Sequence, residues 1–254
     1  MNVEERYVNN RGVNIHVMEA NRGTKDGWPL VVIPGLAEAA EDYREVVEKL
    51  YPRHCVVITL RGRGCSDAPA SGYTLKDHVS DIEAAIEELE LRQFVLMGFS
   101  RGVAYTLGYA VQHPDRIQGL IIGDYPAVHM RLKPGWVEFF SSLPPWRGKP
   151  LSERMSTEAL HALQQESDPV MLWERLPSLH CPALIIRGGT QGAALSAEAA
   201  EQYREMLPQA EIVVFEESDH NIFEPDPNVF IQAAERFMSG IRPYINDKKG
   251  VDVG

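Results

Sequence analysis

Short, uninterrupted runs of apolar and mostly β-branched residues recur along the chain, separated by longer segments with helical spacing. Such runs are typical of parallel strands, because these strands are buried on both faces of their sheet. They stand at residues 30–33, 56–58, 94–97, 120–122, 184–186 and 212–215. Before the first run, residues 7–8 and 13–18 alternate enough between apolar and polar positions to predict an antiparallel hairpin.

The segments between the runs carry apolar residues at three- and four-residue spacing, which predicts helices. Pro114 and Pro208 follow two of these segments and mark their ends. The helices are expected at residues 40–50, 74–90, 103–113, 196–206 and 228–238. Strands that alternate with helices imply a doubly wound α/β sheet with right-handed crossovers. We therefore predict an α/β fold with a mostly parallel sheet of about eight strands and helices on both faces.

Residues 125–181 interrupt this alternation. They have no buried-strand pattern but are rich in proline and in aromatic residues such as Trp136 and Phe140. We interpret them as a small helical lid over the carboxyl ends of the strands, where ligands bind in open α/β sheets. The alternative is a peripheral helical pair whose aromatic side chains only pack on the sheet. The predicted division is a core at 1–124 and 182–245, a lid at 125–181 and a polar tail at 246–254.

Composition narrows the classes of partner. The 254 residues, 44% of them hydrophobic, suit one α/β domain. A formal net charge of −11 disfavours nucleic acid and anionic membranes, because both are polyanionic. We expect a small-molecule substrate, with no nucleic-acid or membrane partner, and a monomer or homodimer.

Cysteine usage and the first residues bear on location. The three cysteines, Cys55, Cys65 and Cys181, have no metal-like spacing, and the start of the chain has neither a basic nor an apolar signal region. No apolar run approaches the roughly 18 residues of a membrane span. These features favour a reduced, cytoplasmic protein.

The candidate chemistry begins at Gly98-Phe99-Ser100-Arg101-Gly102, between the 94–97 run and the next helix. Gly-x-Ser-x-Gly between a strand and a helix is typical of a nucleophile elbow, in which the serine sits on a strained turn. Glycines flank it because side chains would block so tight a crossing. An ordinary Gly/Ser turn is the alternative. We predict Ser100 as the nucleophile.

Four features together resemble the α/β-hydrolase superfamily over nearly the whole chain. They are the elbow, Ile-Pro-Gly-Leu at 33–36, Leu-Arg-Gly-Arg-Gly-Cys-Ser at 60–66, and Asp219-His220 after the last strand. The resemblance implies a serine hydrolase on the α/β-hydrolase fold. The chain departs from the pattern at Pro34, where relatives have a histidine that shapes the loop.

The resemblance also implies roles for particular residues. A serine hydroxyl needs an adjacent base, and His220 is the histidine in the loop from which the family's base comes. The developing oxyanion needs backbone donors, which by resemblance are the N–H groups of Leu36 and Arg101. We expect the lid residues Tyr125, His129, Trp136 and Phe140 to line the substrate pocket.

The acid departs from the commoner pattern. Many relatives place an aspartate after the seventh strand in a Gly-x-x-Asp arrangement, but residues 187–194 contain no carboxylate here. Asp124 ends the sixth strand, the position from which some relatives, including a subset of haloalkane dehalogenases, provide the acid. An aspartate is also common there for structural reasons. Given the vacancy, we predict Asp124 as the acid, ahead of Asp219, Glu198 and Glu38.

The reaction follows from the nucleophile. A serine excludes the dehalogenase and epoxide-hydrolase mechanisms, which require a carboxylate nucleophile, and favours a carboxylesterase or lactonase that forms an acyl-enzyme. A hydrolase of carbon–carbon bonds in ring-cleavage products and a receptor-like ligand-binding protein are the alternatives. No metal or organic cofactor is expected, because no His/Cys/Asp cluster stands out and the glycine-rich turn at 61–66 is neither a P-loop nor a dinucleotide fingerprint.

Overall fold

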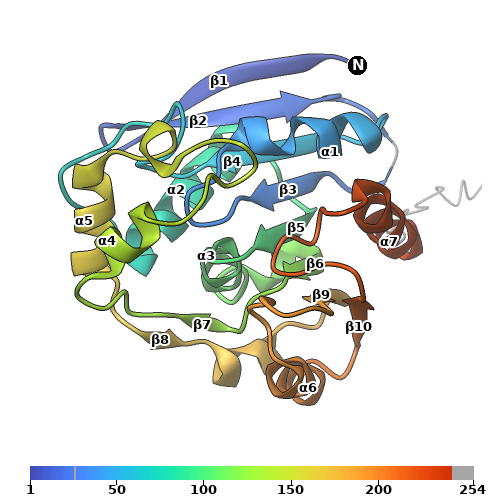
Figure 1. Cartoon of the computed structure of the whole chain (residues 1–254). Helices are drawn as coiled ribbons and strands as arrows, with labels where there is room; N and C mark the ends of the chain where they lie inside the picture. Colours follow the sequence, from blue (N-terminus) through green and yellow to red (C-terminus); the bar gives the residue numbers. More distant parts are fainter. Residues whose placement is uncertain (26, 242–254) are drawn as a thin grey trace, which may run out of the picture.

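The computed structural model describes residues 1–25 and 27–241. Within them, one eight-stranded sheet has the order β1-β2-β4-β3-β5-β6-β9-β10 (Figure 1). Only β2 runs antiparallel to its neighbours, β1 and β4, in this sheet. The predicted mostly parallel α/β sheet is therefore confirmed. Its strands are β1 (Val3–Asn10), β2 (Val13–Ala20), β3 (Leu30–Ile33), β4 (Cys55–Thr59), β5 (Phe94–Phe99), β6 (Ile117–Gly123), β9 (Ala183–Gly188) and β10 (Ala210–Phe215).

Helices cover both faces of the sheet (Figure 1). One face packs against η1 (Ala40–Tyr43), α1 (Arg44–Lys49) and α7 (Pro227–Gly240). The other packs against α2 (Leu75–Glu88), α3 (Gly102–Ala110) and α6 (Ala197–Met206), and a short turn, η2 (Pro114–Arg116), precedes β6.

The strand β3 shows why the apolar runs are continuous. Leu30 and Val32 pack in the core cluster of α1 and α7, whereas Val31 and Ile33 pack in the cluster of α2 and α3. All four side chains are fully buried. Burial of each such side chain contributes about 1.5–3 kcal/mol, so both faces of the strand favour the same register.

The segment between β6 and β9 contains helices, as the sequence predicts, but also a small two-stranded antiparallel sheet that it does not predict. Strands of two residues are too short to show an alternating pattern. The elements are β7 (Val128–His129), α4 (Trp136–Ser141), η3 (Leu151–Glu153), α5 (Thr157–Glu166), β8 (Val170–Met171) and η4 (Trp173–Ser178). The role of 125–181 as a lid, and its boundaries, stay predictions. The predicted tail at 246–254 lies outside the described residues.

Strand order positions the site. β5, β6 and β9 are consecutive neighbours and run parallel, so their carboxyl ends meet at one edge of the sheet. Ser100 follows β5 and Asp124 follows β6. The loop after β9 begins beside them, because Asp124 N–H donates to the Ile186 carbonyl at 2.8 Å. Ligands bind at this edge in open α/β sheets.

Candidate active site

Ser100 lies on a strained turn between β5 and α3. Its φ of 53° is in the left-handed region, which a non-glycine residue adopts at a cost. A Cβ atom at Gly98 would come within 2.5 Å of the Thr106 hydroxyl, and one at Gly102 within 2.3 Å of the Pro34 carbonyl. Both glycines are therefore required by close contacts, and the turn has the geometry of a nucleophile elbow.

Two hydrogen bonds join Ser100, His220 and Asp124. His220 Nδ1 lies 2.8 Å from Asp124 Oδ2, and Nε2 of the same ring lies 2.8 Å from Ser100 Oγ. Because the carboxylate accepts, Nδ1 carries the proton and Nε2 is left as an acceptor facing the hydroxyl. The ring also stacks on Phe99, with centroids 5.1 Å apart. This arrangement holds the imidazole in the tautomer that a general base requires.

The Asp124 carboxylate also organises the loop after β9. It is fully buried and accepts backbone N–H groups of this loop. The donors are Gly188 at 3.0 Å, Ala194 at 2.7 Å and Leu195 at 3.3 Å. The carboxylate that follows β6 thus lies against the loop after β9 and pairs three of its backbone N–H groups. Strand adjacency explains how either strand can supply a carboxylate at this point.

The rival carboxylates lie elsewhere. Asp219 is exposed and accepts the N–H of Asn221 at 2.7 Å. Glu198 is exposed in the first turn of α6, where its own backbone N–H and the Ser196 hydroxyl lower the pKa of its carboxyl. Neither side chain is hydrogen-bonded to His220, whose Nδ1 partner is Asp124.

The loop after β3 presents the expected oxyanion donors. Leu36 and Arg101 both line the cavity that contains Ser100, and within the described residues neither backbone N–H has an intramolecular acceptor. Arg63 Nε donates to the Leu36 carbonyl at 2.8 Å, and Glu38 Oε2 accepts the Gly35 N–H at 2.9 Å. These two side chains hold the loop from both sides and shape it in the absence of the family's histidine.

A cavity of about 850 Å³ opens over Ser100 and His220. The segment between β6 and β9, here called the inserted segment, forms much of its wall. Three of the predicted pocket residues, Tyr125, Trp136 and Phe140, line the cavity. Trp136 and Phe140 stack on each other with centroids 4.7 Å apart. The cavity is large enough for a small organic substrate.

His129 does not line this cavity, so its assignment to the pocket is wrong. The ring is only 1% exposed and lies behind the wall. Its Nε2 accepts from Arg101 Nη2 at 2.8 Å, and its Nδ1–H donates to the Asp168 carbonyl at 2.7 Å. Burial and the Arg101 charge lower the pKa of His129 to about 4. The neutral ring is a structural link between the elbow and the inserted segment.

This burial gives an expected pH dependence of stability. The folded-state pKa of His129 is below the usual 6.5, so the unfolded chain binds the proton more readily between pH 6.5 and 4. The free energy of unfolding therefore falls as the pH decreases through this range. His129→Gln keeps an acceptor for Arg101 and is expected to reduce this loss by about 2 kcal/mol.

Urea unfolding of both proteins at pH 7 and pH 4.5 measures the difference. His161, which is half-buried on α5, provides the control variant His161→Gln, which replaces a histidine and leaves the contact of His129 with Arg101 in place. Equal slopes for His129→Gln and the unsubstituted chain would contradict the assignment.

The sequence did not identify the cavity role of Glu38 and Trp146. Glu38 is 3% exposed, and its carboxylate accepts the Trp146 Nε1–H at 2.8 Å and the Tyr43 hydroxyl at 2.6 Å. Arg147 Nε lies 3.3 Å from the same carboxylate. Trp146 also lies beside the His220 ring, with centroids 6.2 Å apart. The signal in the sequence that could have indicated this contact is Pro-Pro-Trp at 144–146, in which two prolines restrict the backbone before the aromatic residue.

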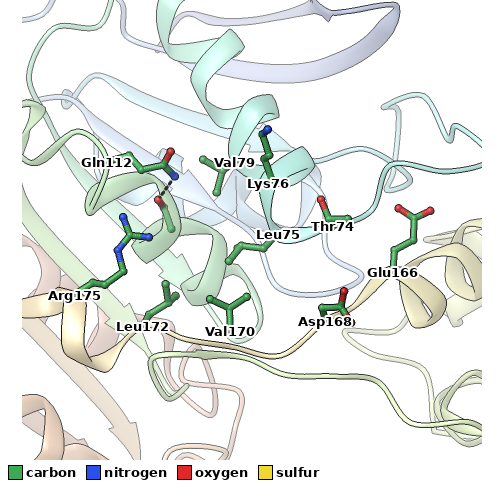
Figure 2. A pocket seen from close by; sticks show the side chains of 11 residues that line it. Thr74, Leu75, Lys76, Val79, Gln112, Glu166, Asp168, Val170, Leu172 and Arg175 are labelled. Atoms are coloured by element: carbon green, nitrogen blue, oxygen red, sulfur yellow. Dashed lines mark hydrogen bonds between the residues drawn. The ribbon is translucent and has the colours of Figure 1, made fainter.

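Figure 2 shows a second, smaller cavity of about 280 Å³ between α2, α3 and the β8 region. Leu75, Val79, Val170 and Leu172 form an apolar floor, and polar side chains surround it. Its lining contains neither Ser100 nor His220, so it does not belong to the catalytic site.

Two further findings concern the described residues alone. Among residues 1–25 and 27–241, no group of three or more His, Cys, Asp or Glu side chains is placed to hold a metal ion. None of the helices there combines the length and the apolar character needed to span a lipid bilayer.

The chain is similar to known proteins in sequence and in fold. A sequence model of the "Alpha/beta hydrolase family" matches residues 30–233. A cis-3-alkyl-4-alkyloxetan-2-one decarboxylase of Shewanella oneidensis is 29% identical over 132 residues, which are 50% of this chain and 40% of that protein. The (E)-2-((N-methylformamido)methylene)succinate hydrolase of Acinetobacter baylyi is 26% identical over 243 residues, which cover 84% of this chain and 91% of that protein. The solved structure of an esterase from Rhodococcus sp. ECU1013 has a TM-score of 0.77 at 21% identity and covers 95% of this chain and 100% of its own.

Proposed function

The chain belongs to the alpha/beta hydrolase family, and we propose that it is a serine hydrolase that cleaves an ester or lactone through an acyl-enzyme on Ser100. The observation that carries the proposal is the pair of 2.8 Å hydrogen bonds from Asp124 through His220 to Ser100. The names of two similar proteins, an esterase and a succinate-derivative hydrolase, support a hydrolytic reaction on a small substrate.

The proposed reaction uses these residues in sequence. His220 Nε2 takes the hydroxyl proton as Ser100 Oγ attacks the carbonyl carbon of the substrate, and the buried Asp124 carboxylate stabilises the imidazolium. The N–H groups of Leu36 and Arg101 donate to the oxyanion. Collapse breaks the carbon–oxygen bond, and the leaving alcohol takes the proton from His220. Water then repeats the steps on the acyl-enzyme and releases the acid and free Ser100.

Repeated turnover tests this proposal against a receptor-like function. With a short-chain aryl ester and a panel of lactones, we expect many product molecules per protein molecule. When deacylation is the slower step, a burst of phenol equal to the protein concentration is also expected. One slow turnover per molecule, without recovery, would contradict a hydrolase and favour a ligand-binding protein.

The aromatic pair of the inserted segment gives a second expected result. Trp136 and Phe140 are half-buried and line the cavity, so Trp136→Ala and Phe140→Ala should change the ranking of acyl substrates by about tenfold in kcat/KM. Both changes should alter the melting temperature only modestly. Val229, which is exposed on α7 and does not line the cavity, offers Val229→Ala as a control.

A large fall in melting temperature with an unchanged substrate ranking would contradict the pocket role of this pair. It would instead support the alternative interpretation, in which the aromatic side chains only pack on the rest of the protein.

A further inference from the structure

Two arginine side chains near Ser100 are buried without an acidic partner. Arg63 is 1% exposed and Arg101 is 2% exposed. Two other buried arginines are paired with carboxylates: Arg61 contacts Asp81 at 2.6 Å, and Arg154 contacts Asp42 at 2.7 Å. Among the described residues, neither Arg63 nor Arg101 has a carboxylate within ion-pair distance. An unpaired buried charge is costly and rarely retained without a role.

The partners of Arg101 are neutral. Its guanidinium donates to the Tyr105 hydroxyl at 3.0 Å, to the Met130 carbonyl at 3.0 Å and to His129 Nε2 at 2.8 Å. Since the His129 ring accepts this bond, it carries no charge. The positive charge of Arg101 is therefore uncompensated.

Arg63 has the same character. It donates to two backbone carbonyls, of Leu36 and Arg61, and its Nη1 lies 2.7 Å from His78 Nε2. Burial and the Arg63 charge lower the pKa of His78 well below its usual value, so this ring is neutral as well. Within the described residues, Arg63 Nη2 is buried with no hydrogen-bond partner.

Both charges lie directly behind the wall of the catalytic cavity. Arg63 contacts the carbonyl of Leu36, Arg101 contacts that of Met130, and both of these residues line the cavity. Tyr125, a third lining residue, has its phenol beside Arg101; burial raises its pKa, so the hydroxyl stays protonated and is able to donate. Because most residues of the wall are apolar, these charges are screened less inside the cavity than charges in bulk water.

The charged residues of the cavity lining are also mostly cationic. Arg101, Arg131, Lys133 and Arg154 line it, against a single carboxylate, Glu38, among the described residues. This balance is opposite in sign to the net charge of −11 of the whole chain. A cavity of one sign in a protein of the other concentrates oppositely charged ligands.

Three of these side chains have a partner of opposite charge, so among the described residues of the lining only Arg101 and the exposed Lys133 are without an ion pair. Glu38 lies 3.3 Å from Arg147, and Arg154 lies 2.7 Å from Asp42. Arg131 contacts Asp168 at 2.5 Å.

We propose that the substrate of this site carries a carboxylate, which binds at the Tyr125 hydroxyl, in front of the buried Arg101 guanidinium, while Ser100 attacks the ester bond. The inference rests on the proposed function and specifies its substrate class. The Tyr125 hydroxyl donates to one carboxylate oxygen. This bond is charge-assisted because its acceptor is ionised, and Arg101 supplies the opposite charge from behind the wall. Lys133 at the exposed edge attracts the anion to the cavity.

The competing explanation is that the two charges serve the reaction centre alone. The guanidinium groups of Arg63 and Arg101 lie near the two oxyanion donors, which are the backbone N–H groups of Leu36 and Arg101. Their positive charge therefore also stabilises the oxyanion. A charge that acts only in this way raises the rates of neutral and anionic substrates alike. A carboxylate site raises only the rate of anionic substrates.

Matched ester pairs separate the two explanations. One pair is phenyl hydrogen glutarate and phenyl 5-oxohexanoate, in which a methyl ketone replaces the acyl carboxylate. The other pair carries the difference on the alcohol: 4-(carboxymethyl)phenyl acetate and 4-(2-oxopropyl)phenyl acetate. We expect the unsubstituted protein to favour the anion of at least one pair by about tenfold or more in kcat/KM. Equal rates within both pairs would overturn the proposal.

Two variants locate the effect. Tyr125→Phe removes one donor without a change of charge and should lower the anion preference severalfold, mainly through KM. Arg101→Gln should abolish the preference. Arg175→Gln removes an exposed cation at the second cavity (Figure 2) and should leave the preference unchanged. If Arg101→Gln and Tyr125→Phe lower the rates of both members of a pair equally, the carboxylate site is wrong.

Binding to Ser100→Ala distinguishes failure of this inference from failure of the proposed function. Calorimetry with this variant should show tighter binding of the anionic ester than of its neutral match, and added salt should reduce the difference. Tighter anion binding without turnover by the unsubstituted protein would leave the carboxylate site standing and remove the hydrolase proposal. Turnover without anion discrimination in rate or binding would do the reverse.

Discussion

Ser100→Ala is expected to lower kcat for ester hydrolysis by about 10⁶-fold, the largest effect of any single change in this chain. The structure places the hydroxyl 2.8 Å from His220 Nε2, and within the proposal no other group accepts the acyl chain. Alanine removes the attacking atom and leaves the strained turn and the donors of Leu36 and Arg101 in place. Stopped-flow and long-time assays with an aryl ester measure the change.

Covalent labelling is the complementary measurement. A fluorophosphonate should modify Ser100 in the unsubstituted protein and should not modify Ser100→Ala. Ser178, which is exposed and donates to the Arg175 carbonyl at 2.8 Å, gives the matched control Ser178→Ala, with full labelling and full rate. Labelling that persists in Ser100→Ala would assign the nucleophile elsewhere.

Asp124→Asn is expected to lower kcat by about 10⁴-fold. The neutral amide cannot stabilise the imidazolium. Its N–H₂ group would also face the hydrogen-bond donors that now surround the carboxylate. The present carboxylate accepts from His220 and from the backbone of Gly188, Ala194 and Leu195. The amide therefore either turns the imidazole to the wrong tautomer or leaves a backbone N–H of the loop after β9 unpaired. We expect some loss of melting temperature, with the fold retained.

Asp219→Asn and Glu198→Gln are the matched controls for this change. Both carboxylates are exposed and make no hydrogen bond to His220, so both variants should keep most of the rate. Circular dichroism shows that each variant is folded before rates are compared. A folded Asp124→Asn with nearly full activity, or an inactive Asp219→Asn, would show that the acid is a different residue.

The order of strands and helices was predictable because it depends on local patterns. Continuous apolar runs such as 30–33 reflect burial on both faces, and these strands form where they were expected. β7 and β8 were not predictable, since two residues give no period. Their pairing depends on a contact between Val128 and Met171, which are far apart in the chain.

In the candidate site, too, local motifs identify some residues, and the position of the others depends on the tertiary structure. The elbow is a local motif, so its glycines and Ser100 could be identified directly. His129 and Tyr125 come from the same short stretch after β6, and the sequence does not distinguish their directions. In the structure Tyr125 lines the cavity, whereas His129 is buried behind it against Arg101. The buried guanidinium of Arg101 was likewise hidden, because the motif concerns only its backbone.

By itself the sequence determined the fold class, the elbow and a short set of candidate acids, because strand burial and tight turns leave signals within a few residues. The tertiary structure decided which side chains meet. The hydrogen bonds of His220 to Asp124 and to Ser100 join residues 96 and 120 positions apart. The Trp146 bond to Glu38 joins residues 108 positions apart. Such pairs meet only because β3, β5, β6, β9 and β10 are consecutive in the sheet and the segment between β6 and β9 lines the same cavity, and no local pattern encodes that geometry.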